Sequence, residues 1–286
     1  MALIPSALKR LFPAVVRDVA RYCANSGYRA MVRHQWSRER HTRRIERVRP
    51  LLWEQLGGIV AGGPFRGLRY IRESVGSAWA PKMLGTYEKE LWPVIDVLIG
   101  RRPRWIIDVG AAEGYYAVGL AMRLGAAQVV AFEADEDSHP ILLKLAELNG
   151  VADRITVRGC CTSQTLDSVL DEIPSPAIIC DVEGAEYELM DPVRIPALTR
   201  SDILVELHEF HRPDMADVLR RRFSGTHDIE LIPSRPRSRK DLPPPVDLTE
   251  ASGAACLDEQ RPGPMNWFWM TAKAATAGHT GTRHRT

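Results

Sequence analysis

The sequence predicts an α/β fold, in which a mostly parallel, seven-stranded sheet carries helices on both faces and is preceded by a helical extension. Three observations predict it. From residue 105 onward, apolar runs of strand length alternate with segments whose apolar residues recur at helical spacing, as is typical of parallel sheets. A glycine-containing turn joins the first of these runs to a helical segment. Residues 1–84 show no strand pattern, so we expect them to be helical.

The first unit of this fold opens with an apolar strand at 105–107 that ends in Asp108. A glycine turn at 110–114, an apolar helix and a second strand at 128–132 follow, and the second strand ends in Glu133. A carboxylate about 20 residues beyond the last glycine is the layout of a nucleoside-binding crevice, in which Glu133 can accept hydrogen bonds from ribose hydroxyls. The unit predicts a cofactor site, although this glycine spacing alone is also common in ordinary tight turns.

The chemistry of the turn indicates which nucleoside is bound. Dinucleotide-binding turns carry G-x-G-x-x-G and direct helix N–H groups at a pyrophosphate. Here Gly110 and Gly114 enclose three residues without a middle glycine, and acids stand at Asp108 and Glu113. Carboxylates repel a pyrophosphate and attract a ligand that bears an ammonium and a sulfonium group. The turn resembles the S-adenosylmethionine (SAM) site of class I methyltransferases, and SAM is the predicted cofactor.

The later elements continue the alternation. In order, the sequence predicts a helix at 141–148, strands at 155–158, 177–180 and 203–205, a helix at 215–223, and two late strands at 228–232 and 267–271. Ser138 is a candidate cap for the first of these helices, which Asn149-Gly150 closes, and Pro213 opens the second. Because parallel strands point the same way, the residues that follow them should gather at one edge of the sheet.

A second signature stands at two of these strand ends. The strand at 177–180 runs into D-x-E-G-x-E at 181–186, and the next strand runs into E-x-H at 206–208. With G-T-Y-E at 85–88, these motifs resemble the FkbM-type methyltransferases over residues 85–210. The resemblance implies a Rossmann-like class I methyltransferase sheet and SAM-dependent methyl transfer, in many members to hydroxyls of sugars, glycolipids or polyketide-type molecules. The chain departs from the pattern in a short segment between the third and fourth strands and in long extensions at both ends, which leaves the acceptor open.

The predicted site residues lie in the turn and at the strand ends. The predicted cofactor-binding residues are Tyr87, Asp108, Gly110, Ala111, Glu113, Gly114, Glu133, Ala134, Cys160, Cys161 and Asp181. The two cysteines are expected to line the adenine as packing residues. The predicted catalytic residues are Asp181, Glu183 and His208, with His208 as the general base because imidazole titrates near neutral pH. Two alternatives stay open: His208 as a structural hydrogen-bonding residue, and Glu183 as an acid favoured at a helix start by the helix dipole.

A divalent metal is the competing explanation for this cluster of acids and histidine. Oxygen and nitrogen ligands for an ion that polarises a substrate hydroxyl would come from Asp181, Glu183, Glu206 and His208. The sequence has no H-x-x-x-H motif and no cysteine pair with the C-x-x-C spacing that would support zinc. The expectation from the sequence is therefore no metal.

Three segments organise the chain. We expect residues 1–84 to form an N-terminal extension or cap, residues 85–274 the SAM-dependent methyltransferase domain, and residues 275–286 a disordered tail. Within the domain, the proline- and charge-rich segment 235–263 is an insertion. Its length predicts either a lid over the substrate or a disordered loop.

The run at 33–49 holds seven arginines and two histidines. Such a stripe could bind RNA, an acidic glycan or a membrane surface, so an RNA-directed methyltransferase is one alternative function. We favour a solvated helix face, because the net charge is only +2 and aromatic and basic residues do not interleave as in RNA-binding modules. The expected partner is a small-molecule or glycan acceptor, and nucleic acid is not expected. A non-catalytic SAM-binding protein is the other alternative.

Composition agrees with one catalytic domain and an appendage. A chain of 286 residues, 45% of them hydrophobic, can bury a full α/β core. It contains no apolar run near the roughly 18 residues that cross a bilayer, and its start lacks the continuous apolar segment of a secretory signal. Five cysteines without C-x-x-C spacing fit reduced thiols, so we expect a cytoplasmic protein.

Overall fold

A seven-stranded sheet lies at the centre of the structure, a computed structural model that describes residues 26–75, 77–244, 246–261, 263 and 265–274, with side chains from residue 41 onward. The strands are β1 (Trp105–Val109), β2 (Gln128–Phe132), β3 (Ile155–Arg158), β4 (Ala177–Cys180), β5 (Asp202–Leu207), β6 (His227–Ile232) and β7 (Asn266–Ala272). Their order across the sheet is β3-β2-β1-β4-β5-β7-β6. Strands β1 to β5 are parallel, and β7 runs antiparallel to both β5 and β6. The predicted mostly parallel, seven-stranded sheet is confirmed.

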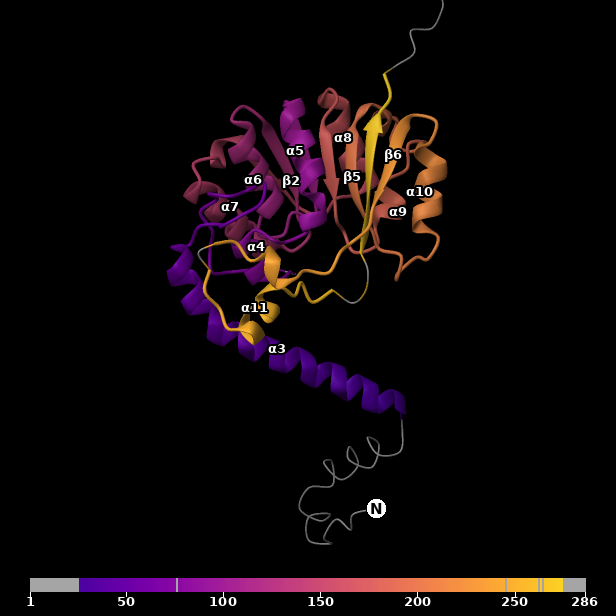
Figure 1. Ribbon diagram of the computed structural model, residues 1–286. Coiled ribbons are helices and arrows are strands. Elements are labelled where there is room, and N and C mark those ends of the chain that lie inside the picture. The colour runs from indigo at the N-terminus through magenta and orange to yellow at the C-terminus, as the bar shows by residue number, and fades with distance from the viewer. Residues whose placement is uncertain (1–25, 76, 245, 262, 264, 275–286) are drawn as a thin grey trace, which may run out of the picture.

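Helices cover both faces of the sheet (Figure 1). Those whose buried residues pack in one core are α5 (Trp92–Arg101), α6 (Tyr115–Leu124) and α7 (His139–Leu148), and those in the other are α8 (Ser163–Glu172), α9 (Glu186–Leu189) and α10 (Met215–Phe223). Successive strand residues alternate between the two cores, so that Ile106 packs in the first and Ile107 in the second. Burial on both faces explains why the central strands β1, β2, β4 and β5 are mostly apolar.

Short 3-10 turns connect several of these elements. They are η1 (Lys89–Leu91), η2 (Glu136–Ser138), η3 (Ala152–Arg154), η4 (Pro196–Arg200) and η5 (Arg239–Asp241). The predicted cap at Ser138 is wrong, because its side chain caps no backbone N–H of α7 and instead donates to Asp135 Oδ2 at 2.7 Å. Asp135 is the residue that caps this region, since it accepts from the backbone N–H of Asp137 at the start of η2.

The N-terminal extension is only partly helical. Helix α3 (Ser26–Leu56) runs beneath the sheet in Figure 1, and α4 (Trp79–Leu84) follows it. The prediction of helix is wrong for residues 57–75 and 77–78, which form turns and loops with an isolated antiparallel bridge between Ile59 and Arg69. The first 25 residues and the predicted tail at 275–286 lie outside the described residues. Where the structure describes helices, none combines the length and the apolar character that a bilayer span requires.

The insertion at 235–263 folds back onto the N-terminal extension. It contains η5 and α11 (Glu250–Leu257), and α11 lies against α3 and α4 (Figure 1). Arg44 Nη1 donates to the carbonyl of Ala251 at 3.4 Å, and Gln55 Nε2 donates to the carbonyl of Asp247 at 3.1 Å. Segments about 200 residues apart in the sequence therefore pack together on one side of the domain.

The carboxyl ends of β1, β2 and β4 are held close together by backbone contacts. Gly110 N donates to the carbonyl of Phe132 at 2.9 Å, and Asp181 N donates to the carbonyl of Val109 at 2.9 Å. Gly110 has φ +89°, and a Cβ at this position would lie 1.8 Å from the Asp181 carbonyl oxygen. Only glycine satisfies both conditions, so this residue lets the first turn and the end of β4 share one edge of the sheet.

Candidate functional site

A cleft of about 370 Å³ opens at this edge, between the glycine turn and the ends of β2, β3 and β4. Clefts at the carboxyl ends of parallel strands are the usual ligand sites of such sheets, and this volume falls within the range of small-molecule pockets. The predicted site residues that line it are Tyr87, Asp108, Gly110, Ala111, Glu133, Ala134, Cys160, Cys161, Asp181 and Glu183. The predicted residues outside the lining are Glu113, Gly114 and His208.

Glu133 stands at the tip of β2 with its carboxylate fixed by the backbone. Its Oε2 accepts from Ala112 N at 2.7 Å, and its Oε1 accepts from Asp135 N at 2.8 Å. These contacts hold the carboxylate over the glycine turn, at the mouth of the cleft. A carboxylate has lone pairs beyond these two bonds, so it retains the capacity to accept from ligand hydroxyls.

Asp108 is a buried acid that is only partly compensated, by a backbone hydrogen bond at Ala117 and by the charge of Lys82. It is 2% exposed, and its Oδ2 makes no hydrogen bond. Burial raises the pKa of Asp108 to about 7, and the negative charges of Asp181 and Glu133 push it in the same direction. This wall of the cleft therefore concentrates negative charge, which favours a cationic ligand.

Glu113 points away from the cleft although it belongs to the same turn. Its fully buried carboxylate pairs with Lys82 at 2.6 Å and accepts from the Tyr70 hydroxyl at 2.7 Å. Burial alone would raise the pKa of Glu113, but Lys82 and Tyr70 outweigh it and hold the pKa below the usual value. Gly114 is equally internal, since a Cβ there would lie 2.8 Å from Leu142. Glu113 therefore ties the turn to the N-terminal extension.

Cys160 and Cys161 follow β3 and line the far wall of the cleft. Burial, with a smaller contribution from Cys160, raises the pKa of the Cys161 thiol to about 12. A thiol with such a pKa stays protonated and is a poor nucleophile near neutral pH. The position and the pKa both agree with a packing residue beside a ligand.

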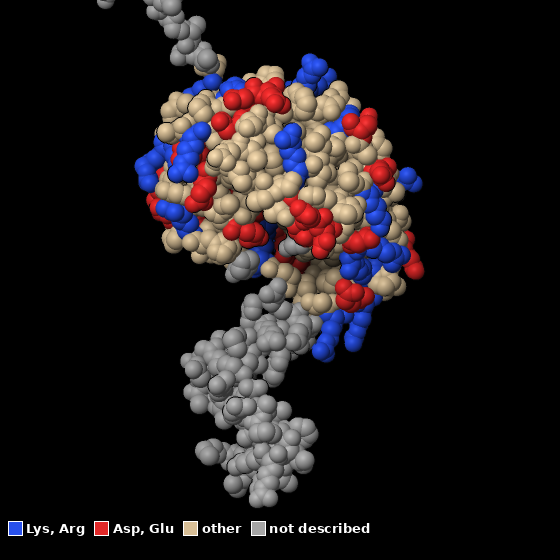
Figure 2. Space-filling view, turned by 180° about the vertical axis from the view of Figure 1, so that it is seen from behind, with Lys and Arg blue, Asp and Glu red and all other residues tan. Residues whose placement is uncertain are grey.

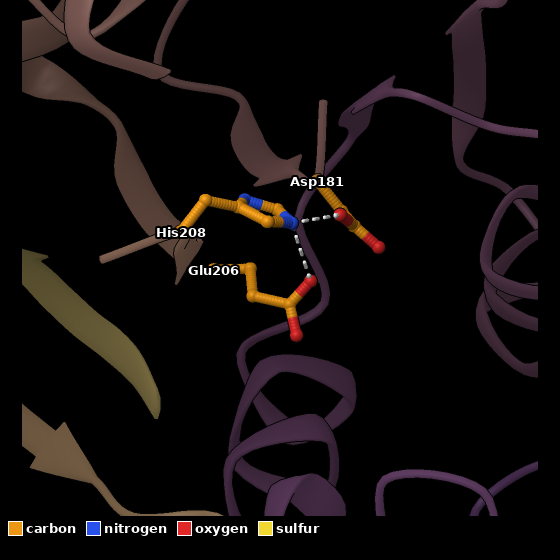
Figure 3. Close-up of side chains that lie close together, drawn as sticks. All are labelled: Asp181, Glu206 and His208. Carbon is orange, nitrogen blue, oxygen red and sulfur yellow. Dashed lines mark ion pairs between the residues drawn. The ribbon is translucent and has the colours of Figure 1, made fainter. Parts of the chain in front are cut away.

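The second group of predicted residues gathers behind the cleft floor, where β4 and β5 end (Figure 3). His208 Nε2 lies 3.6 Å from Asp181 Oδ1 and 3.4 Å from Glu206 Oε2. Glu183 Oε2 lies 3.4 Å from the same nitrogen, although its side chain is 74% exposed. Asp181 and Glu183 reach the cleft, whereas the imidazole is fully buried beneath them.

A further carboxylate fixes the orientation of the imidazole. Glu186 is fully buried, and its Oε1 accepts from His208 Nδ1 at 2.7 Å. Burial opposes protonation of His208, but the hydrogen bond that it donates to Glu186 and the charges of Glu186, Asp181 and Glu183 together raise its pKa. The ring is therefore clamped at Nδ1, with Nε2 directed at the carboxylates of Asp181 and Glu206.

Sequence reasoning missed Arg261, which completes the site from the late insertion. Its guanidinium pairs with Glu206 Oε1, with Glu88 Oε1 and, at 2.8 Å, with Glu259 Oε2. Burial of these acids raises the pKa of Glu88 to about 7 and also raises the pKa of Glu206. Glu88 belongs to the G-T-Y-E motif, so the sequence indicated that its position matters. The sequence around Arg261 contains no motif that predicts its contact with Glu206.

On the face shown in Figure 2, the distribution of surface charge does not indicate a nucleic-acid site. Figure 2 shows basic and acidic residues interspersed over that face of the described molecule. Arginines of the predicted basic stripe also serve the fold, since Arg44 contacts α11, and Arg49 stacks on the Trp79 ring at 4.7 Å. These two guanidinium groups are committed to contacts within the chain.

No family model matches the sequence, so the FkbM resemblance stays a prediction. Among solved structures, the chain is similar to the O-methyltransferase from Bacillus cereus in complex with SAH, with 17% identity over 61% of this chain and 77% of that chain and a TM-score of 0.40. It is also similar to the O-methyltransferase TomG from Streptomyces achromogenes in complex with SAM (15% identity, 69% and 92% coverage, TM-score 0.42) and to a precorrin-6y C5,15-methyltransferase from Geobacter metallireducens (11% identity, 64% and 89% coverage, TM-score 0.42). Likeness at this level concerns the fold alone, and the strand order of the chain itself establishes a Rossmann-like α/β fold.

Proposed function

We propose that this chain is a SAM-dependent methyltransferase that transfers a methyl group to a hydroxyl of a small-molecule or glycan acceptor. The observation that carries the proposal is the cleft at the strand ends, with Asp108 and Glu133 on one side and Asp181 on the other. It combines an acid placed for a ribose, the buried Asp108 beside the glycine turn, and further acids where a sulfonium and an acceptor would meet.

The residues present fit this cofactor. Glu133 would bind the ribose hydroxyls, Ala134 and the two cysteines would border the adenine, and Asp108 with Asp181 would favour the positive charge of the amino acid moiety and the sulfonium. Gly110 and Ala111 supply the close backbone wall. SAM supplies an activated methyl group whose thioether leaves without a proton.

The protein must then hold an acceptor oxygen in line with that methyl group, about 3 Å away, and favour the loss of its proton. Asp181 and Glu183 reach the cleft and would contact the acceptor. His208 was predicted to be the general base, but its ring is fully buried behind these acids. We therefore propose that His208 is a positioning residue that acts through Asp181 rather than on the acceptor itself.

Thermal unfolding with candidate cofactors tests the proposal. SAM or its demethylated product should raise the Tm of the full chain, and NAD should not. At a ligand concentration of 100 times Kd, linkage stabilises the folded state by about 2.7 kcal/mol, which is readily measured. A shift with NAD and none with SAM would overturn the proposal.

A second measurement separates transfer from binding. The full chain is incubated with SAM and a panel of hydroxylated acceptors, including sugars, glycolipids and phenols, and the release of demethylated product is followed. Acceptor-dependent release supports an O-methyltransferase. Tight SAM binding without release on any acceptor of the panel would favour the non-catalytic alternative.

A further inference from the structure

The environment of His208 Nε2 is unusual for a buried nitrogen. The side chain is fully buried, and Nε2 makes no hydrogen bond, although carboxylate oxygens of Asp181, Glu183 and Glu206 surround it at 3.4–3.6 Å. Polar atoms this deeply buried are normally paired, so an unpaired one aimed into a cluster of acids requires an explanation.

Negative charge exceeds the nearby positive charge at this point. Four carboxylates lie within 3.6 Å of the imidazole, namely those of Asp181, Glu183, Glu186 and Glu206. The arginine beside them, Arg261, pairs with both Glu206 and Glu88, and also with Glu259, which has a second partner in Arg237 at 2.8 Å, so the charge of Arg261 is divided between Glu206 and Glu88. Because uncompensated buried charge is costly, such an arrangement favours an additional cation.

The geometry leaves a place for that cation. One oxygen of Asp181, one oxygen of Glu206 and a nitrogen of His208 all lie within 4.8 Å of one another (Figure 3). Ligand atoms bound at about 2.0–2.2 Å from a common ion are themselves about 3.0–3.5 Å apart, close to the 3.4 and 3.6 Å that separate Nε2 from the two oxygens. The ion would need only small side-chain shifts.

The surrounding residues prepare these ligands. Glu186 accepts a hydrogen bond from the Nδ1–H group of His208, so in the neutral imidazole the free lone pair lies on Nε2. Carboxylates make the same contact behind metal-bound histidines. Arg261 holds Glu206 Oε1, which directs Oε2 of the same carboxylate toward the cluster. Both supporting contacts come from residues outside the three candidate ligands, and both favour the same arrangement.

We propose that Asp181, Glu206 and His208 bind a divalent transition-metal cation of the Mn²⁺ class. The imidazole favours such an ion over Mg²⁺ or Ca²⁺, for which oxygen ligands are preferred, and the two carboxylates favour it over copper. Three protein ligands leave coordination positions open, and the partly exposed Asp181 places the ion next to the cleft.

The role of the ion, unlike its binding, rests on the proposed methyl transfer. A bound divalent ion lowers the pKa of a coordinated oxygen by many units, to about 7 for water on zinc, and would therefore assist Asp181 in favouring the loss of the acceptor proton. The ion would hold the acceptor oxygen beside Asp181 and stabilise its negative charge.

Mn²⁺ itself is the probe for this site. The full chain is stripped with a chelator, and Mn²⁺ is added in the absence of SAM while the electron paramagnetic resonance (EPR) signal of the free ion is followed. We expect one saturable site, and pulsed EPR should detect a coupled imidazole nitrogen. Asp181→Asn and His208→Gln should each weaken Mn²⁺ binding at least tenfold, and His208→Gln should abolish the nitrogen coupling. The matched control is Asp171→Asn, which removes an exposed acid of α8 and should change neither.

Several results would overturn the inference: no saturable site, a site without nitrogen coupling, or unchanged affinity in Asp181→Asn. Circular dichroism and Tm confirm that each variant is folded, and Asp181→Asn keeps the test valid should His208→Gln fail to fold, because its side chain is partly exposed. The Tm shift with SAM is measured separately. Mn²⁺ binding without that shift would retain the metal site and reject the proposed function, and the reverse result would reject only the metal site.

Discussion

Two clusters of buried charge border the same cleft, and they differ in how their charges are balanced. In the first, Lys82 meets Glu113, and that carboxylate also accepts from the Tyr70 hydroxyl. In the second, Asp181 and Glu206 face the unpaired Nε2 of His208. In the first cluster the carboxylate has both a cation and a hydrogen-bond donor as partners, whereas in the second cluster the carboxylates outnumber the cationic side chains.

The difference teaches how to separate a structural cluster from a functional one. A buried pair with matched charges and satisfied hydrogen bonds needs nothing further, so its natural role is to fix the fold. A buried cluster with excess charge and an unpaired nitrogen raises the free energy of the ligand-free protein, and binding of a ligand offsets that cost. We therefore expect substitutions in the first cluster to affect stability and substitutions in the second to affect activity.

The largest effect is expected at Asp181. Asp181→Asn keeps the shape and removes the charge, so turnover should fall by about 10²–10⁴-fold, the range for a positioned proton-transfer group. SAM affinity, measured by calorimetry, should change far less, and Asp171→Asn serves as the control. Full turnover in Asp181→Asn would mean that the second cluster, like the first, stabilises the fold, and the proposed difference between the two clusters would be rejected.

Lys82 tests the other side of the comparison. Lys82→Met leaves the buried Glu113 without its cation and should cost about 3–5 kcal/mol of unfolding free energy, measured by denaturant titration. The double variant Lys82→Met/Glu113→Gln removes the orphaned charge and should recover part of that loss. An unchanged free energy of unfolding in Lys82→Met would mean that the charge pairing between Lys82 and Glu113 does not stabilise the fold.

Asp108 provides a pH-dependent test of an unbalanced acid. Its pKa is raised to about 7 in the folded protein, against about 3.9 for an unfolded aspartate. The folded state thus holds the proton of Asp108 more tightly, so the contribution of this group to stability is fully present below about pH 4 and is lost as the pH rises through 7. Between pH 5 and pH 8 the parent should lose about 3 kcal/mol more unfolding free energy than Asp108→Asn. Parallel pH profiles for the two proteins would contradict the raised pKa.

Glu133 is the intermediate case, a half-buried acid whose partners are backbone N–H groups. Glu133→Ala should weaken SAM binding by about 1.5–3 kcal/mol, the usual worth of hydrogen bonds to a charged group. Glu133→Gln retains an oxygen for the Ala112 N–H, so it separates loss of the ligand contact from loosening of the turn. Equal SAM affinity in the parent and in Glu133→Ala would exclude Glu133 as the ribose ligand.

The sequence predicted the residues that local geometry brings together. Asp108, Gly110 and Glu133 belong to one strand–turn–helix–strand unit, so their spacing alone places them at one edge. Asp181 and His208 follow later parallel strands, and their meeting required the strand order that the family resemblance implied. The central strands could be predicted because burial on both faces makes them mostly apolar.

What the sequence could not predict depends on long-range packing. Glu113 shares the turn with Gly110, yet it faces the opposite way because Lys82 and Tyr70 supply a buried partner that no spacing rule reveals. Arg261 reaches Glu206 across 55 residues of chain. Charge in a proline-rich insertion is usually solvated, so nothing in the local pattern indicated that this guanidinium would be buried beside the strand ends.

The position of β7 constrains the order in which the molecule can be completed during synthesis. This strand is the last in sequence, yet it lies between β5 and β6 and pairs with both. While the ribosome still holds residues 266–272, β5 remains an edge strand and β6 lacks its partner in the sheet. Arg261, just upstream, reaches Glu88 and Glu206 in the same late interval. The acidic cluster can therefore assemble only after residues 261–272 have left the ribosome, later than the parallel strands β1 to β5.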